Sequence, residues 1–162
     1  MKNNISAFLI LLIVIFFSLD SYQSFAKDYN IDSLVQVLES SKGLEKIPYY
    51  YVITDYYSYY SPDKAIRFAN EFLVLGEKCD STEIIEYSYQ ILGESYFLQE
   101  KFDNALNYFN KFLDTQVSKN DEKGIGRAYN NLGIVYRALE DYPRAIQCYE
   151  KSIEIYLKYN DI

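Results

Sequence analysis

The residues that could carry chemistry are few in this 162-residue chain. It contains no histidine and only two cysteines, which removes the commonest general base, a serine-type triad and most zinc sites. The remaining candidates are the carboxylates of Glu94, Asp103 and Asp141. Asp103 and Asp141 lie at predicted helix starts, where an acid stabilises the helix by up to about 1 kcal/mol without any catalytic role. The sequence has no glycine-rich phosphate loop and no calcium loop, so we expect no enzymatic activity, no cofactor and no metal.

The net charge of the chain limits the class of macromolecule that it can bind. There are 23 acidic and 16 basic side chains, a formal net charge of -7, whereas a protein that binds nucleic acid needs a basic surface for the phosphates. We therefore expect no nucleic acid among its partners. The apolar fraction of 49% indicates a folded domain rather than disorder. The sequence leaves open whether Cys79 and Cys148 form a disulfide or remain separate buried thiols.

The first 26 residues have the order of a secretory signal peptide. Lys2 gives a positive start, residues 5–19 carry no charge, and Ser24-Phe25-Ala26 places small residues at its first and third positions. The apolar stretch is shorter than the roughly 20 residues that a membrane span requires, so we expect cleavage after Ala26. The alternative is an uncleaved anchor with Lys2 on the inner side. In both cases we expect residues 27–162 to be exported, in the periplasm or otherwise outside the cytoplasm of a bacterial cell.

The rest of the chain repeats with a period of 40 residues. Seven columns align over three blocks without a gap, which identifies a repeat protein. The columns are Tyr49, Tyr89 and Tyr129; Val52, Leu92 and Leu132; Ile53, Gly93 and Gly133; Tyr56, Tyr96 and Tyr136; Ala65, Ala105 and Ala145; Ala69, Phe109 and Tyr149; and Phe72, Phe112 and Ser152.

The chemistry of the columns predicts two helices in each block. Tyr129, Leu132 and Tyr136 lie at positions i, i+3 and i+7, which form one stripe on a helix. Gly133 costs about 1 kcal/mol inside a helix relative to Ala, and this is tolerated where a neighbouring helix passes too closely for a Cβ atom. Pro143 falls in the first turn of the second helix, where its missing N–H costs nothing. Each block is therefore predicted to be a helix, a tight turn and a second helix.

These columns resemble those of a tetratricopeptide repeat. The motif is Leu132-Gly133-x-x-Tyr136 followed by Ala145-x-x-x-Tyr149. The second block matches almost as well, whereas the first is degenerate, with Ile53 in place of the glycine and Ala69 in place of the aromatic residue. The period is longer than the usual one of about 34 residues. It is similar to that of the long-helix subgroup typified by kinesin light chains, and to repeats in the sensor regions of Bacteroidetes signalling proteins.

The resemblance implies an all-α superhelix of three antiparallel helix pairs. We expect the repeats at residues 46–85, 86–125 and 126–162. Residues 27–45 supply a short N-terminal capping helix that begins at Asp32-Ser33 and carries Leu34, Val37 and Leu38. The first helix of each pair is expected to build a concave wall that contacts the ligand.

Eight residues of that wall are the expected ligand contacts: Tyr50, Tyr57, Gln90, Glu94, Arg127, Asn130, Asn131 and Arg137. Their expected neighbours on the wall are Ile47, Tyr51, Thr54, Tyr87, Phe97 and Ile134. Asn131 matches an asparagine that hydrogen-bonds a bound peptide backbone in the long-helix subgroup. Two interpretations stay open for the seven tyrosines within residues 49–60, an aromatic binding platform or core packing. The two arginines form either a site for an acidic ligand or a solvated helix face.

The last helix is predicted to carry an uncovered apolar stripe, made of Ile146, Tyr149, Ile153, Tyr156 and Leu157. The sequence stops shortly before a fourth block would begin, so we expect either a longer protein or a last helix covered by a partner or a second copy. The predicted function is an exported protein–protein interaction module that binds a peptide or protein in its groove. The alternative is the N-terminal extracytoplasmic sensor region of a histidine kinase or a transcriptional regulator. Membrane contact is expected only through the leader, if it is uncleaved.

Overall fold

The computed structural model describes residues 30–160, with side chains described as far as residue 158. All regular structure in this range is helical. The elements are α3 (Ile31–Ser40), the 3-10 helix η1 (Gly43–Lys46), α4 (Ile47–Tyr60), α5 (Pro62–Lys78), α6 (Thr82–Leu98), α7 (Phe102–Lys119), α8 (Glu122–Ala138) and α9 (Tyr142–Asn160). The predicted signal peptide and its cleavage after Ala26 lie outside the described residues. None of the helices within residues 30–160 has the length and apolarity that a membrane span needs.

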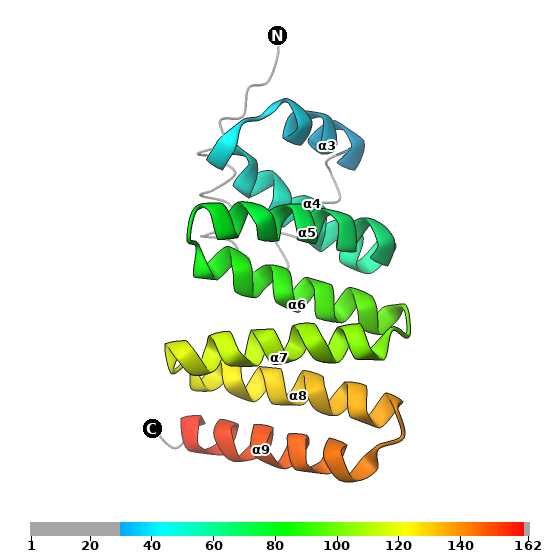
Figure 1. Cartoon of the computed structure of the whole chain (residues 1–162), viewed down its shortest axis with the longest axis vertical. Helices are drawn as coiled ribbons and strands as arrows, with labels where there is room; N and C mark the ends of the chain where they lie inside the picture. The colour runs from blue at the N-terminus through cyan, green and yellow to red at the C-terminus, as the bar shows by residue number, and fades with distance from the viewer. Residues whose placement is uncertain (1–29, 161–162) are drawn as a thin grey trace.

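The helices stack in chain order along the long axis of the molecule, from α3 at one end to α9 at the other (Figure 1). Each packs against the helices before and after it in the sequence. The predicted all-α solenoid of three antiparallel helix pairs with an N-terminal capping helix is therefore confirmed. The first helices of the second and third pairs begin at Thr82 and Glu122, four residues ahead of the block starts expected from the columns.

The turns repeat with half the period of the helix pairs. Asp80, Glu100, Asn120 and Glu140 all have φ between 51° and 60°, the left-handed conformation that commonly ends a helix. Each lies at or just after the end of α5, α6, α7 or α8. Three of the four helices that follow begin with side-chain caps: the Ile84 N–H donates to Ser81, the Gly124 N–H to Asp121 and the Arg144 N–H to Asp141. Helix α7 begins without a side-chain cap. Asp141 is thus a helix cap, as its position in the sequence predicts.

Small residues on the first helices allow close approach by rings of the second helices. A Cβ atom added at Gly93 would lie 2.6 Å from the Phe109 ring, and one at Gly133 would lie 2.7 Å from the Tyr149 ring. The predicted reason for a glycine within these helices is therefore confirmed. In the first pair the sizes are exchanged, because Ile53 replaces the glycine and Ala69 replaces the ring, and both are fully buried. The degenerate block thus keeps one large and one small side chain at the same level of the core.

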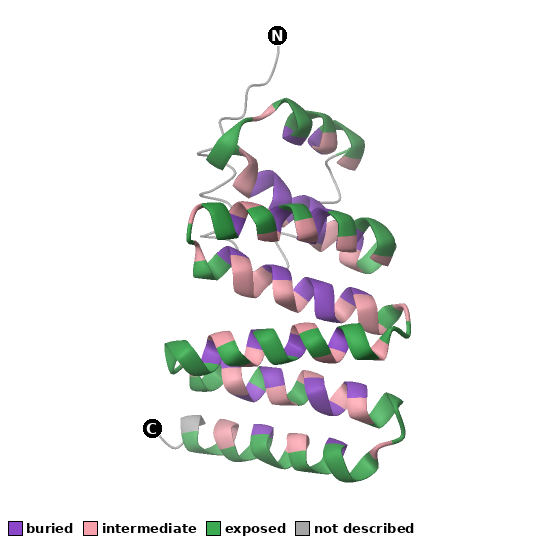
Figure 2. Ribbon diagram, in the orientation of Figure 1, coloured by how far each residue is buried: buried purple, intermediate pink, exposed green. Residues whose placement is uncertain are grey.

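The N-terminal cap covers α4. Leu34 and Leu38 of α3 are buried against the same core cluster as Ile53, whereas Val37 is exposed. At the opposite end α9 buries Ala145 and Ser152, and exposed residues dominate the face of α9 that points away from the stack (Figure 2). Cys79 and Cys148 are free, half-buried thiols in different repeats.

Candidate functional site: the wall of first helices

The first helices α4 and α6 contact each other directly across the intervening helix α5. The Tyr87 hydroxyl of α6 donates to the Tyr51 carbonyl oxygen of α4 at 3.3 Å and lies 3.1 Å from the Thr54 hydroxyl. The Tyr51 and Tyr87 rings meet edge to face with centroids 4.7 Å apart. These contacts place α4 and α6 on one side of the stack. We call the surface formed by α4, α6 and α8 on that side the first-helix wall.

The first-helix wall contains a pocket of about 260 Å³. Its lining is Tyr51, Glu83, Glu86, Tyr87, Gln90, Phe112 and Arg127. Of the eight predicted ligand contacts, the structure brings Gln90 and Arg127 together here, and it adds the predicted neighbours Tyr51 and Tyr87. A pocket with aromatic rings and a few polar groups has the composition of a binding site. A second hollow, of about 340 Å³, lies over the α6–α7 turn and Leu139, away from the wall.

Arg127 is the cation of this pocket. Its side chain is exposed, and its guanidinium carbon lies 5.4 Å from the centroid of the Phe112 ring, which is 1% exposed. No carboxylate within the described residues forms an ion pair with it. Arginine presents donors in a rigid fork that matches a carboxylate, and it also stacks on rings. The guanidinium is therefore held in place by an aromatic surface while its donors stay available.

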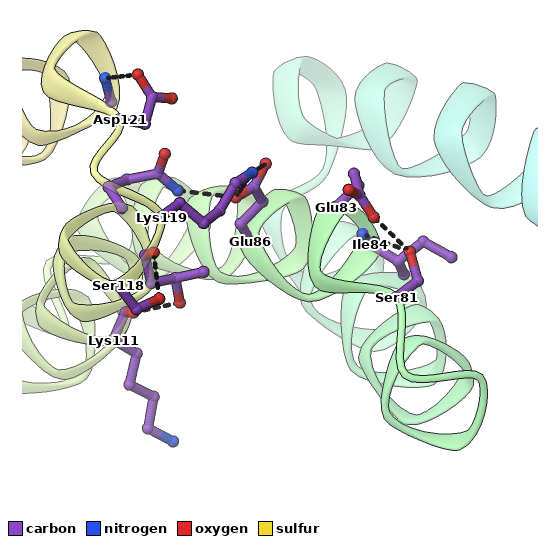
Figure 3. A network of polar contacts seen from close by, with 11 residues as sticks. Ser81, Glu83, Ile84, Glu86, Lys111, Ser118, Lys119 and Asp121 are labelled. Carbon is purple, nitrogen blue, oxygen red and sulfur yellow. Dashed lines mark hydrogen bonds and ion pairs between the residues drawn. The ribbon is translucent and has the colours of Figure 1, made fainter.

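The two carboxylates of the pocket are already engaged within the protein. Glu86 accepts hydrogen bonds from the buried Gln116 amide at 2.9 Å and from the Lys119 ammonium at 2.9 and 3.1 Å. Figure 3 shows Lys119 of α7 reaching Glu86 of α6. Glu83 accepts from the Ser81 hydroxyl at the start of α6. A hydrogen bond from the Glu83 backbone N–H and, to a lesser extent, the Ser81 bond lower the pKa of the Glu83 carboxyl group. These acids position helices α6 and α7, which leaves Arg127 as the pocket charge without a close partner among the described residues.

Beyond the pocket the wall continues through Gln90, Glu94 and Asp55. The Gln90 amide donates to the Glu94 carboxylate at 3.0 Å. Burial raises the pKa of Glu94, Asp55 adds to that rise, and the Gln90 bond and Arg127 oppose it. Burial likewise raises the pKa of Asp55. Since burial disfavours the charged form, both carboxyl groups hold a proton to higher pH than an exposed carboxyl group does.

Two predicted ligand contacts need correction. Tyr50 and Tyr57 are each only 5% exposed, because α5 places a ring beside each of them. Tyr50 stacks on Phe72 with centroids 5.1 Å apart, and Tyr57 stacks on Phe68 at 5.6 Å. Burial and the Glu71 carboxylate raise the pKa of Tyr50 to about 12. Both residues belong to the core, and Thr54, a predicted neighbour, is fully buried as well.

The tyrosine-rich segment divides between core and surface. Tyr49 is also buried, Tyr51 and Tyr56 are half-buried, and Tyr59 and Tyr60 are 66% and 73% exposed. Packing thus accounts for most of these side chains, and no continuous aromatic platform forms. Asn130 and Arg137 are exposed and Asn131 is half-buried on α8. These three residues do not line the pocket, and their predicted role in binding stays a prediction.

Sequence reasoning missed three pocket residues. Glu83 and Glu86 lie in the first turns of α6, and Phe112 comes from α7, a second helix. Phe112 belongs to a repeat column, and that signal indicated core packing only. No group of His, Cys, Asp and Glu side chains within residues 30–160 is arranged to hold a metal ion.

Comparison with known proteins agrees with this architecture. Residues 83–158, which run from the first turn of α6 to the last turn of α9, match the tetratricopeptide repeat family. A crystal structure described as BtubC (BKLC) from P. vanneervenii is similar, with a TM-score of 0.63 and 15% sequence identity. The match covers 89% of this chain and 59% of that one, so this chain spans less than two thirds of that protein. A comparison with curated protein sequences finds no match.

Proposed function

Because residues 83–158 match the tetratricopeptide repeat family, we propose that this chain binds an extended peptide or protein segment along a concave first-helix wall. Repeats of this family indicate a protein–protein interaction module. The observation that supports the location is the pocket between α4, α6 and α8. Aromatic rings line this pocket together with the Arg127 guanidinium, which has no ion pair among the described residues. The family is a non-catalytic scaffold, so no reaction is assigned.

The chemistry of the pocket favours an acidic side chain in the ligand. Glu83 and Glu86 already have partners, whereas the Arg127 donors remain available for a carboxylate. The Tyr51 and Tyr87 rings provide a surface for an adjacent apolar side chain, at a low cost in conformational entropy. We therefore expect the bound segment to combine an Asp or Glu with a neighbouring apolar residue.

A display library of random peptides tests this proposal. Peptides selected on the full chain should be enriched in Asp or Glu next to an apolar residue. Arg127→Glu should weaken an enriched peptide by about ten- to a hundred-fold, since a hydrogen bond to a charged group contributes about 1.5–3 kcal/mol. The matched control is Lys42→Glu, an equal charge change at an exposed residue between α3 and η1. Equal affinities of the Arg127→Glu and Lys42→Glu variants would overturn the assignment.

We also propose that the module works outside the cytoplasm. The support is the order of Lys2, the uncharged stretch 5–19 and Ser24-Phe25-Ala26, which is typical of a signal peptide. N-terminal sequencing of protein recovered from the periplasmic fraction should begin at Lys27. Recovery of the uncleaved chain from the cytoplasm would contradict this. A sensor region of a histidine kinase or transcriptional regulator stays the alternative, and it shares the exported location.

A further inference from the structure

The hollow of about 340 Å³ at the α6–α7 turn lies on the edge of the stack that also carries the α8–α9 turn (Figure 1). We call it the edge hollow. It is lined by Glu100, Lys101, Phe102, Asp103, Asn104 and Leu139. None of these residues lines the pocket of the first-helix wall. The edge hollow is therefore a second concave surface, with side chains of its own.

The chain itself shows what occupies the equivalent point between the first and second helix pairs. One period before Asp103 and Leu139 are Asp63 and Gln99. The Gln99 amide, at the end of α6, donates to the Asp63 carboxylate in the first turn of α5 at 2.7 Å. The side-chain oxygen of Gln99 is buried there. A side chain with an N–H donor thus fills this point and satisfies the carboxylate.

The junction between the second and third pairs lacks that donor. Leu139 is the residue that ends α8, as Gln99 ends α6, and a leucine side chain has no N–H group. An ionised carboxylate can only accept hydrogen bonds, so Leu139 gives Asp103 nothing in place of the Gln99 bond. The result is a carboxylate beside a hollow, where the preceding junction has a carboxylate beside an amide.

The charges of the lining favour a cation over a neutral amide. Glu100 and Asp103 are exposed, and neither forms an ion pair among the described residues. Lys101 has no ion pair in the described part of the chain either, and its ammonium lies 6.0 Å from the centroid of the Tyr96 ring. Two negative charges against one positive charge leave the lining acidic.

The apolar part of the lining suits a long side chain. Leu139 is 41% exposed, and the half-buried Phe102 packs with Phe97 at a centroid distance of 5.9 Å. Arginine and lysine lay their methylene stems on apolar surface while the charged head reaches a polar partner. Arginine also presents a planar fork of donors that matches a carboxylate. An arginine side chain therefore combines the two properties that the edge hollow selects.

We propose that the edge hollow binds an arginine side chain of a partner protein. Its guanidinium donates to Asp103, in the place that the Gln99 amide takes on Asp63, and its stem lies against Leu139. The edge hollow is separate from the first-helix wall, so the proposal does not depend on peptide binding in the wall. It adds a contact for a basic residue to a protein whose wall pocket carries a guanidinium of its own.

The probe for the test is N-acetylarginine amide, titrated into the isotope-labelled full chain and followed by NMR. We expect saturable shifts of the backbone amides of residues 100–104 and 139. Asp103→Asn should weaken binding by about ten-fold or more, because it removes a hydrogen bond between charged groups. The matched control is Asp63→Asn, at the same position of the first pair, where Gln99 is already the partner. Both aspartates are exposed, so both variants should keep their circular dichroism spectrum.

Leu139→Gln gives a second test that removes no charge. The introduced amide would reach Asp103 as Gln99 reaches Asp63, and it would fill the edge hollow from within the chain. We expect this variant to bind the probe about ten-fold more weakly and to unfold at a higher temperature than the wild type. The gain in thermal midpoint should disappear when Asp103→Asn is added, because the carboxylate acceptor is then gone.

The proposal is overturned if the probe causes no saturable shift at residues 100–104 in a chain whose helical spectrum is intact. Equal affinities of the wild type and Leu139→Gln would overturn it as well. Shifts of equal size around Asp63 would assign the effect to general attraction between a cation and an acidic protein. N-acetylcitrulline amide has the same stem without the charge and should bind more weakly, and equal binding of the two probes would contradict a site for a cation.

Discussion

The backbone of Gly133 lies against the ring of Tyr149, so that a Cβ atom at Gly133 would stand 2.7 Å from the ring carbon Cε1. We expect Gly133→Ala to lower the free energy of unfolding by about 1 kcal/mol. Overpacking a core costs about 1–3 kcal/mol, which exceeds the gain of about 1 kcal/mol in helix propensity. Urea denaturation followed by circular dichroism measures the difference.

Gly126→Ala is the matched control for that substitution. Gly126 lies on the same helix, but its nearest neighbours, in Ile155 and Tyr156, would be 3.3 Å from an added Cβ atom. Small shifts of these side chains can accept a methyl group, so we expect no loss of stability or a gain of up to about 1 kcal/mol. Equal effects of the two substitutions would contradict the close approach at Gly133.

The bonds of Glu86 predict an asymmetry between two alanine variants. Glu86→Ala removes the acceptor of the Gln116 amide, which is 1% exposed, and an unsatisfied buried donor costs about 1–3 kcal/mol. Lys119→Ala removes only a partly exposed ion pair, which contributes at most about 1 kcal/mol. We therefore expect Glu86→Ala to lower the midpoint of thermal unfolding more than Lys119→Ala does. The reverse order would show that the Gln116 bond contributes little.

The raised pKa of Glu94 predicts a dependence of stability on pH. Burial disfavours the charged carboxylate in the folded state, so the group destabilises the fold above its folded pKa. That effect fades as the pH falls through the folded pKa towards the ordinary value of about 4.3. We expect Glu94→Gln to raise the thermal midpoint at about pH 7 and to have no effect at about pH 4. Glu39→Gln, at an exposed position of α3, should have little effect at either pH, and a similar gain there would point to net charge instead.

The fold was predictable because its main contacts recur at one period. Gly93 with Phe109 and Gly133 with Tyr149 occur in the same columns, so a local pattern reports a tertiary contact. The exchange of large and small side chains in the first pair is also visible in the sequence, because Ile53 and Ala69 both differ from the other residues of their columns. Columns of this kind specify which helices pair, and the structure follows them.

The candidate site was predictable only in part. Whether a residue of a first helix lines the wall depends on the direction of its side chain, and helix register alone does not determine that direction. Gln90 and Arg127 line the pocket, as their positions in the helix register predict. Tyr50 and Tyr57 have matching register positions but stack on Phe72 and Phe68 instead, because burying a ring against another ring is favourable. Phe112 enters the pocket from a second helix, and no pattern within α6 or α8 signals that contact.

The central claim, that the first-helix wall is the ligand surface, is tested most directly by photo-crosslinking. An acidic peptide selected on the full chain is synthesised with a diazirine next to its acidic residue, and the crosslinked sites are mapped by mass spectrometry. We predict crosslinks at α6 and α8, on and around Tyr87, Gln90 and Arg127. Crosslinks confined to α5, to α9, or to parts of α7 away from Phe112 would contradict the account.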